Sequence, residues 1–279
     1  MGCCEGTEAY RVPAAGTVGK ELRMARLFPE RGGSLVVAAD HGIFGVFEGL
    51  EDVPETVRQL LPEGPDAFLL TAGMFRRVYR QWAALGRRAP AVILALDAHI
   101  RTSIPKSPQS GDAYRLLASV EQAAAMGADA VKVVLVFAQD SLEPFALNME
   151  SVARVVREAD RLGMPVMVEP TFWGRLVGEG TPVEPKAVAH ICRIAVELGA
   201  DILKAPFAGT PEEYRPVVEH SPVPVTILGG AKSNRLEDML SSVRAAMSIG
   251  VRGVVFGRNI WQYPDKAEVM RELRAALRG

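Results

Sequence analysis

Short, continuously apolar runs recur along the chain, and helix-like stretches separate them. Continuous apolarity, unlike strict alternation, is typical of parallel strands that are covered on both faces. Glycines that typically end helices precede several of the runs. Eight such strand–helix units in roughly 250 residues predict a (β/α)₈ (TIM) barrel. The expected strands are SLVVAAD (34–40), AFLLTA (67–72), AVILALD (91–97), AVKVVLVF (130–137), PVMVEP (165–170), ILKAPF (202–207), VTILGG (225–230) and GVVFGR (253–258).

A doubly wound open sheet is the alternative architecture. It usually has fewer strands and a glycine-rich turn after the first one. Here the first run is followed by DHGIFGVFEGL, which is not the G-x-G-x-x-G pattern. No linker or compositional break divides the chain. We therefore expect one domain, with an N-terminal lead-in over residues 1–25 and a single barrel over residues 26–279.

Composition excludes several classes of function. The 279 residues carry a net charge of −1 with mixed signs, which argues against nucleic-acid and membrane-surface partners. No apolar run approaches the roughly 20 residues of a membrane span, and the N-terminus does not read as a signal peptide. The start MGCC fails the myristoylation pattern because residue 6 is glycine. Cys3, Cys4 and Cys192 offer no disulfide framework and no metal-ligand spacing, so we expect a reduced, cytoplasmic protein.

Polar side chains stand where most of the expected strands end. In a barrel of this kind the carboxyl-terminal ends of the strands carry the active site. Two lysines lie inside expected strands, whereas the others fall in helical or loop contexts. The candidate site residues are Asp40, His41, Asp97, Lys132, Glu169, Lys204, Gly229, Gly230, Ala231, Gly257 and Arg258.

Lys204 lies within the apolar run GADILKAPF, where a buried ammonium is costly unless it is paired or loses its proton. The two-residue period of a strand puts Ile202, Lys204 and Pro206 on one face. If that face is the lumen, Leu203 and Ala205 face the helices.

The second strand lysine, Lys132, would share the lumen with Lys204. Two ammonium groups about 6 Å apart repel by roughly 3 kcal/mol at an effective dielectric constant near 20, which would lower the pKa of one amine. A free amine attacks a carbonyl to form a Schiff base, so we predict that Lys204 is a nucleophile. Asp40 and Glu169 are the expected proton carriers, and the sequence does not decide which serves which step.

The segments after the last two strands predict an anion site. LGGAK and FGRNI put small residues next to Arg258 where strands give way to helices, an arrangement that suits a phosphate. His41 either acts directly or hydrogen-bonds a loop, and Asp97 binds substrate hydroxyls or caps the loop 98–111. That loop is expected to cover the substrate. Candidates for a second anion contact are Arg101, Lys106 and Arg175, and Trp173 is expected at the mouth of the site.

Three further residues have no expected part in the chemistry. His190 and Cys192 lie on an expected helix and are predicted to pack. His99 has no partner spaced for metal binding, so no metal site and no cofactor are expected.

The motifs ADHG, GADILK, VPVTILGGAK and GVVFGRNIWQ resemble the class I aldolases of the DeoC/fructose-bisphosphate aldolase superfamily. The resemblance runs from about residue 22 to the end. It implies a (β/α)₈ barrel, Lys204 as the Schiff-base lysine, Asp40 as its helper, and a phosphate held by Gly229, Gly230, Gly257 and Arg258. Oligomers are common among these relatives, so a homo-oligomer is expected.

One segment departs from the archaeal-type fructose-bisphosphate aldolases. Those enzymes have a YPRG-like motif whose tyrosine is the acid/base, and here the segment reads VEPTFWG. GADAVKVVLVF and VMVEPTFWG are instead similar to tagatose-bisphosphate and sulfofructose-phosphate aldolases. That similarity implies that Lys132 and Glu169 belong to the site.

The resulting expectation is a metal-independent class I aldolase that reversibly cleaves a phosphorylated ketose. An acyl-transferring, thiolase-like or transaldol-type enzyme would use the same lysine. The third alternative is a barrel that binds a sugar phosphate without catalysis.

Overall fold

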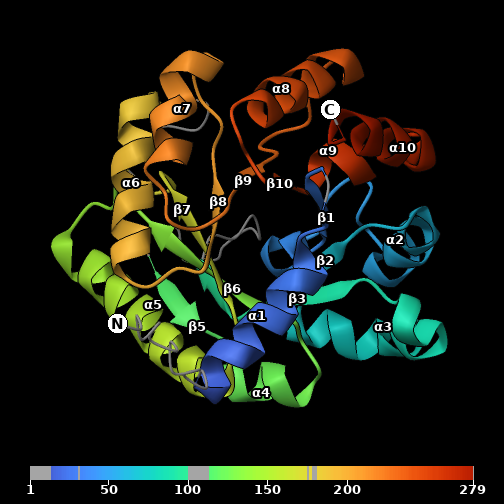
Figure 1. The fold of residues 1–279 in the computed structure, drawn as a ribbon, viewed down its shortest axis with the longest axis horizontal. Coiled ribbons are helices and arrows are strands. Elements are labelled where there is room, and N and C mark those ends of the chain that lie inside the picture. The colour runs from blue at the N-terminus through green and yellow to red at the C-terminus, as the bar shows by residue number, and fades with distance from the viewer. Residues whose placement is uncertain (1–13, 31, 100–112, 175, 178–180, 279) are drawn as a thin grey trace, which may run out of the picture.

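A computed structural model of the chain contains a closed barrel of parallel strands (Figure 1). It describes residues 14–30, 32–99, 113–174, 176–177 and 181–278. Around the ring the order is β1-β10-β9-β8-β7-β6-β3-β2, which is the expected (β/α)₈ architecture. The strands are β1 Ser34–Ala38, β2 Ala67–Thr71, β3 Ala91–Ala95, β6 Ala130–Val136, β7 Val166–Thr171, β8 Ile202–Ala205, β9 Val225–Leu228 and β10 Gly253–Phe256.

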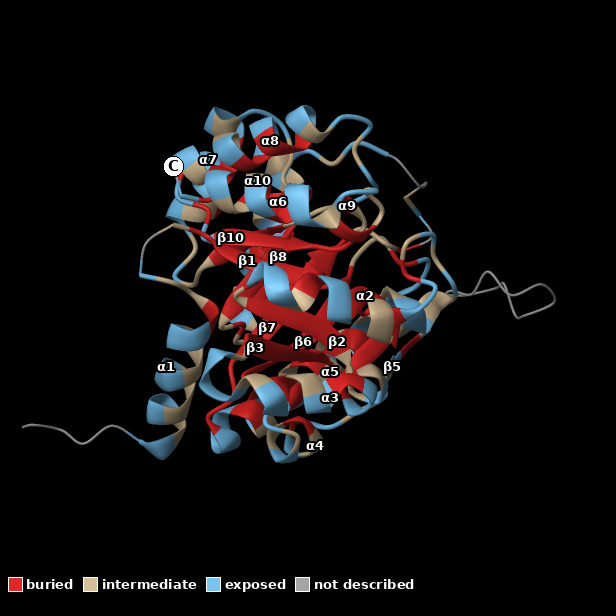
Figure 2. Ribbon diagram, turned by 90° about the vertical axis from the view of Figure 1, so that its right-hand side faces the viewer, coloured by how far each residue is buried: buried red, intermediate tan, exposed pale blue. Residues whose placement is uncertain are grey.

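Helices surround the barrel, with buried faces toward the strands and exposed faces outward (Figure 2). Short 3₁₀ turns occur at His41–Phe44, Leu61–Glu63 and Gly86–Arg88, and a four-residue helix, α9 Arg258–Trp261, directly follows β10. The longer helices are α1 Ala15–Leu27, α2 Val53–Leu60, α3 Ala72–Leu85, α4 Val120–Ala125, α5 Leu142–Leu162, α6 Pro185–Glu197, α7 Pro211–Glu219, α8 Leu236–Ser248 and α10 Lys266–Ala276.

The side chains of each strand alternate between two apolar layers. Ile202 belongs to the cluster that fills the lumen, whereas Leu203 and Ala205 belong to the cluster between strands and helices. The same alternation directs Lys204 into the lumen, because it shares its strand face with Ile202. The orientation expected from the period of two is therefore the one observed.

The expected third strand is shorter than predicted. β3 ends at Ala95, and Asp97–His99 forms β4, which pairs antiparallel with β5 Tyr114–Leu116 outside the barrel. β6 is longer than β3, so part of its edge lacks a neighbouring strand. The side chains of Asp97 and Asn148 bond to that edge, since Asp97 Oδ2 accepts from Val134 N (2.6 Å) and Asn148 Oδ1 accepts from Val136 N (2.8 Å).

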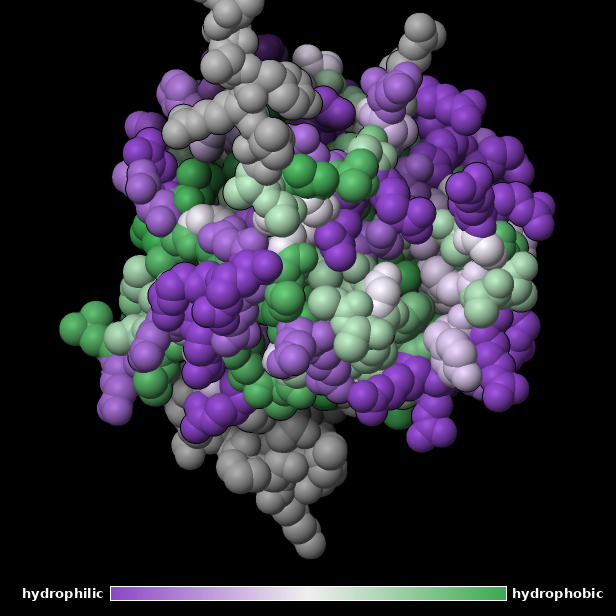
Figure 3. Space-filling model, turned by 60° about the horizontal axis from the view of Figure 1, so that its bottom comes forward, coloured by the Kyte–Doolittle hydropathy of each residue, from purple (hydrophilic) through white to green (hydrophobic). Residues whose placement is uncertain are grey.

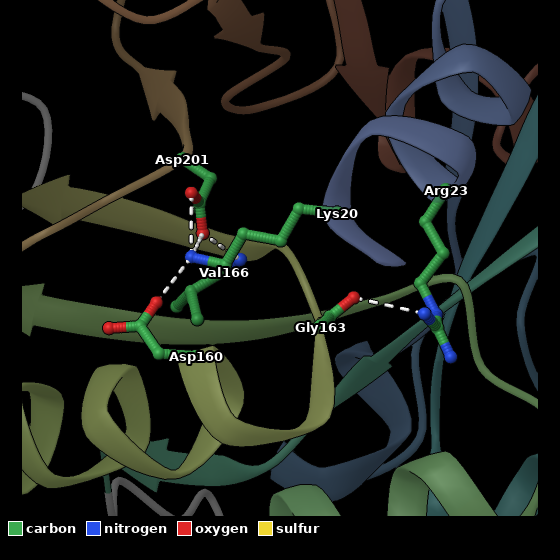
Figure 4. A network of polar contacts seen from close by, with 6 residues as sticks. All are labelled: Lys20, Arg23, Asp160, Gly163, Val166 and Asp201. Atoms are coloured by element: carbon green, nitrogen blue, oxygen red, sulfur yellow. Dashed lines mark hydrogen bonds and ion pairs between the residues drawn. The ribbon is translucent and has the colours of Figure 1, made fainter. Parts of the chain in front are cut away.

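α1 lies against the amino-terminal end of the barrel (Figure 1). Its Lys20 Nζ lies 2.6 Å from Asp160 Oδ1 and 2.8 Å from Asp201 Oδ2 (Figure 4). Leu27 at its end is buried in the lumen cluster. The predicted boundary at residue 25 thus falls inside a helix that contributes to the core, while Cys3 and Cys4 lie outside the described residues.

None of the helices in the described part of the chain is long and apolar enough to cross a bilayer. On the face drawn in Figure 3, hydrophilic residues are interspersed with apolar ones.

Candidate active site

A cavity of about 490 Å³ opens at the carboxyl-terminal ends of the strands. Among the predicted site residues that the structure describes, Asp97 alone does not line it. The predicted residues that do are Asp40, His41, Lys132, Glu169, Trp173, Lys204, Gly229, Gly230, Ala231, Gly257 and Arg258. Side chains from six strands or the segments after them therefore converge on one site.

Four buried charged side chains of alternating sign form the floor of this cavity. Asp40 Oδ2 lies 3.3 Å from Lys132 Nζ. Glu169 Oε2 lies 3.1 Å from Lys132 Nζ and 3.0 Å from Lys204 Nζ. The order Asp40–Lys132–Glu169–Lys204 has a net charge of zero, which makes its burial tolerable.

Glu169 corrects the sequence-based picture of the two lysines. Mutual repulsion was expected to dominate, but the carboxylate lies between the ammonium groups. At an effective dielectric constant near 20, each contact of about 3 Å is worth about 5 kcal/mol of attraction, more than the roughly 3 kcal/mol of expected repulsion. The resting Lys204 amine is therefore paired with a carboxylate.

The same neighbours shift the pKa values of the floor. Burial would raise the pKa of Glu169, but Lys204 and Lys132 outweigh it and lower that pKa below its ordinary value. The pKa of Asp40 is also lowered, because Lys132, His41 and Lys204 overcome its burial. Burial would lower the pKa of Lys132, and the attraction of Glu169 and Asp40 raises it instead.

The imidazole of His41 lies between Asp40 of the floor and the rings of Phe47 and Trp261. Its Nδ1 is 3.4 Å from Asp40 Oδ1, and its ring meets Phe47 and Trp261 edge-on at 5.9 and 5.6 Å between centroids. Trp261 is itself fixed, since its Nε1 donates to the Ala38 carbonyl at 2.9 Å. This packing holds the imidazole beside Asp40.

The segments after β9 and β10 form a cradle of small residues at one side of the cavity. Gly230 has φ of +63°, a conformation that favours glycine. A Cβ at position 257 would lie 2.8 Å from the Ala38 carbonyl oxygen, so only glycine fits there without displacement. Asn259 joins the two segments, because its Nδ2 donates to the Gly229 and Ala231 carbonyls and its Oδ1 accepts from Ser233 N. The sequence analysis gave Asn259, within FGRNI, no role of its own.

Asp97 is displaced from its expected position at the cavity. It lies on β4 and bonds to the edge of β6, so it supports the strand that carries Lys132. Burial raises the pKa of its carboxyl to about 6, and the nearby Lys132 opposes this only in part. The expected role in substrate binding does not match this position, and the loop that Asp97 was expected to cap lies almost entirely outside the described residues.

Several predictions concern other positions. His190 was expected to pack but is exposed on α6, whose buried stripe is Val188, Ile191, Cys192 and Ala195. Arg101, Lys106 and Arg175 lie outside the described residues, as does nearly all of loop 98–111. Among the described residues no group of three or more His, Cys, Asp or Glu side chains could hold a metal ion.

The sequence reading missed most of the cavity's upper lining. Most of these residues come from the segments after strands, where no period identifies the inward side, whereas His99 lies on β4 and Thr171 ends β7. They are Phe44, Phe47, His99, Thr171, Phe172, Val177, Thr181 and Val183.

Comparisons with known proteins agree with this architecture. Residues 34–263 match the model of the DeoC/LacD family aldolases. An uncharacterized aldolase of Saccharolobus solfataricus is 37% identical over 258 residues, covering 89% of this chain and 91% of the relative. The 2-amino-3,7-dideoxy-D-threo-hept-6-ulosonate synthase of Halobacterium salinarum is 32% identical over 260 residues, 93% of this chain and 91% of that protein.

A solved structure of an archaeal fructose-1,6-bisphosphate aldolase, with its catalytic lysine bound to the carbinolamine intermediate, has a TM-score of 0.77 and 29% identity to this chain. The match covers 92% of this chain and 99% of that one. The resemblance inferred from the motifs is thereby confirmed. The chain is an enzyme that belongs to the DeoC/LacD family of aldolases.

Proposed function

We propose that this protein is a class I aldolase that forms a Schiff base through Lys204 and reversibly cleaves a phosphorylated ketose. The observation that carries the proposal is the Lys204 amine, buried in the lumen and 3.0 Å from the Glu169 carboxylate. A nucleophilic amine needs an adjacent group that takes its proton, and Glu169 is within reach.

In the proposed mechanism Lys204 Nζ attacks the ketone carbon as its proton passes to Glu169. The carbinolamine then loses its hydroxyl as water, with a proton returned by Glu169, and an iminium forms. The iminium draws in the electron pair of the breaking C–C bond, which supplies the electron sink without a metal ion. The result is an enamine and a free aldehyde.

Asp40 serves the cleavage itself in this scheme. It takes the proton of the hydroxyl on the carbon that becomes the aldehyde, while Lys132 and His41 hold its carboxylate in place. Asp40 then returns this proton to the enamine carbon, and hydrolysis by water releases a ketone of the dihydroxyacetone-phosphate type and restores Lys204. One water leaves and one returns, so the cycle balances.

The cradle after β9 and β10 is the proposed phosphate site. Gly229, Gly230, Ala231 and Gly257 allow close approach to backbone N–H groups, and Arg258 lines the same wall. A phosphate held there leaves the ketone carbon within the lumen near Lys204. We also propose a homo-oligomer in the cytoplasm, the assembly and compartment expected from the sequence.

Borohydride trapping tests this function. The protein is incubated with dihydroxyacetone phosphate, reduced, digested and analysed by mass spectrometry. We expect the mass of the reduced ketone phosphate on the peptide that contains Lys204, and none in Lys204→Met. Lys186→Met, at an exposed lysine in the first turn of α6, is the matched control and should label normally. Labelling at another lysine, or none with a panel of ketose phosphates, would contradict the proposal.

A further inference from the structure

Two aromatic walls stand above the charged floor of the cavity. Phe44 and Phe47 follow β1, and Phe172 and Trp173 follow β7. In the ring order β1 and β7 are four places apart among eight strands, so they lie on opposite sides of the lumen. The two walls therefore face each other across the space above Lys204.

Both walls are fixed by packing. Phe47 meets His41 at 5.9 Å and Trp261 at 6.5 Å between ring centroids. On the other side Phe172 meets Phe137 at 6.2 Å, and Phe137 in turn meets Phe145 at 5.2 Å. The space between the two walls, which we call the slot, is therefore already formed before any substrate binds.

The segment that carries Phe172 and Trp173 is also anchored through its backbone. A Cβ at position 174 would lie 2.1 Å from the backbone carbon of Ala138, and Gly174 N donates to the Phe137 carbonyl at 2.9 Å. The turn after β7 is therefore held against the turn after β6. The backbone next to Phe172 and Trp173 is thereby fixed.

Among the described residues that line the cavity, the charged or titratable side chains are the four of the floor, His41, His99 and Arg258 of the cradle. Above the floor, the side opposite Phe44 and Phe47 continues with Val177, Thr181 and Val183. A polyhydroxylated chain would lose hydrogen bonds to water along these surfaces without replacing them. An apolar group would gain from burial there.

Two hydroxyl side chains, Thr171 and Thr181, interrupt the apolar surfaces, and of these only Thr171 is buried. Thr171 is two residues beyond Glu169 on the same strand face, and its side chain is 2% exposed. Its Oγ1 has no hydrogen-bond partner among the described residues. One buried hydroxyl matches the single oxygen that an apolar aldehyde brings.

From these observations we propose that the aldehyde half of the substrate is uncharged and largely apolar, such as an arylacetaldehyde or a branched aliphatic aldehyde. This inference rests on the proposed aldolase function. The ketone phosphate occupies the cradle and Lys204, and the apolar group lies between the two walls. Thr171 donates a hydrogen bond to the aldehyde oxygen, which becomes a hydroxyl in the condensation product.

The test measures kcat/KM for aldol addition of dihydroxyacetone phosphate to phenylacetaldehyde and to D-glyceraldehyde 3-phosphate. We expect phenylacetaldehyde to be favoured at least about tenfold. Phe44→Asn should reduce this preference at least about threefold, whereas Tyr79→Ala, which removes an exposed ring on α3, should leave it unchanged. Thr171→Val should slow the addition while borohydride still traps the ketone at Lys204.

A second measurement separates this inference from the proposed function. Saturation-transfer NMR with 2-phenylethanol reports binding in the slot without any reaction. We expect binding that Phe44→Asn weakens and Tyr79→Ala does not. Failure to trap a ketone phosphate, with this binding intact, would refute the aldolase chemistry and keep the apolar slot. Preference for glyceraldehyde 3-phosphate, or 2-phenylethanol binding that is absent or insensitive to Phe44→Asn, would overturn the slot.

Discussion

The two ends of the barrel both contain buried or half-buried acids paired with basic side chains, yet the acids differ in what else they bind. At the amino-terminal end, Asp66, Asp129 and Asp201 each stand directly before a strand. Each accepts the first or second backbone N–H of a neighbouring strand, from Leu35, Val92 and Val166 respectively. Each also pairs with a basic side chain, which is Arg274, Arg26 and Lys20 in the same order.

At the carboxyl-terminal end, the contacts found for Asp40 and Glu169 are to the charged and titratable side chains of the floor and His41. The comparison teaches that an acid bonded to strand backbone reinforces the barrel, whereas an acid bonded only to side chains is available for proton transfer. Mutations at the two ends should distinguish acids that stabilise the barrel from acids that transfer protons.

Lys204→Met should have the largest effect. It removes the proposed nucleophile while Glu169 keeps Lys132 as a partner, so we expect the fold to persist and kcat/KM to fall by about 10⁴-fold or more. Steady-state kinetics and circular dichroism check the two parts. Retention of more than about a tenth of the activity would remove Lys204 from the chemistry.

Glu169→Gln should impair both activity and stability. It removes the carboxylate that both lysines share and leaves two ammonium groups facing each other. We expect kcat/KM to fall by about 10² to 10⁴-fold. The free energy of unfolding should fall by about 3 kcal/mol, the cost of leaving buried charge unpaired. Urea denaturation measures the second effect, and unchanged stability would mean that the four-charge floor is not maintained in solution.

The sequence predicted the strands, the inward face of β8 and the set of residues on the floor, because these follow from a period of two and from the polarity of strand ends. It did not predict that Glu169 lies between the lysines, because that depends on how far long side chains from β6, β7 and β8 reach across the lumen. Asp97 was misplaced because β3 ends two residues earlier than its apolar run suggests. Of the four aromatic residues in the two walls, only Trp173 was predicted, and the other three were missed because they lie in segments after strands, where no period identifies the inward side.

The raised pKa of Asp97 predicts how the free energy of unfolding depends on pH. Its folded-state pKa of about 6 exceeds its ordinary value of 3.8, so between these values the folded chain holds a proton that the unfolded chain has released. The free energy of unfolding therefore falls as pH rises through this window, by at most about 3 kcal/mol. In Asp97→Asn the amide oxygen can still accept from Val134 N. The amide does not ionise, so the variant does not lose this stability as pH rises.

The stability of Asp97→Asn relative to the wild type should thus increase from pH 4 to pH 7. Urea denaturation curves measured at several pH values for both proteins give this difference. Parallel curves for the two proteins would mean that Asp97 ionises in the folded state as readily as in the unfolded one.

The smallest effects are expected at the amino-terminal end and concern stability alone. Asp201→Ala removes the acceptor for Val166 N together with one partner of Lys20, so we expect a loss of about 2 kcal/mol in the free energy of unfolding. Lys20→Met leaves the Asp201–Val166 bond intact and should cost only about 1 kcal/mol. In both variants kcat/KM should stay within about twofold of the wild type, because the contact lies at the end of the barrel opposite the cavity. A fall in kcat/KM of more than about fivefold in Asp201→Ala, in protein that is still fully folded, would show that the two ends are coupled through β7 and β8.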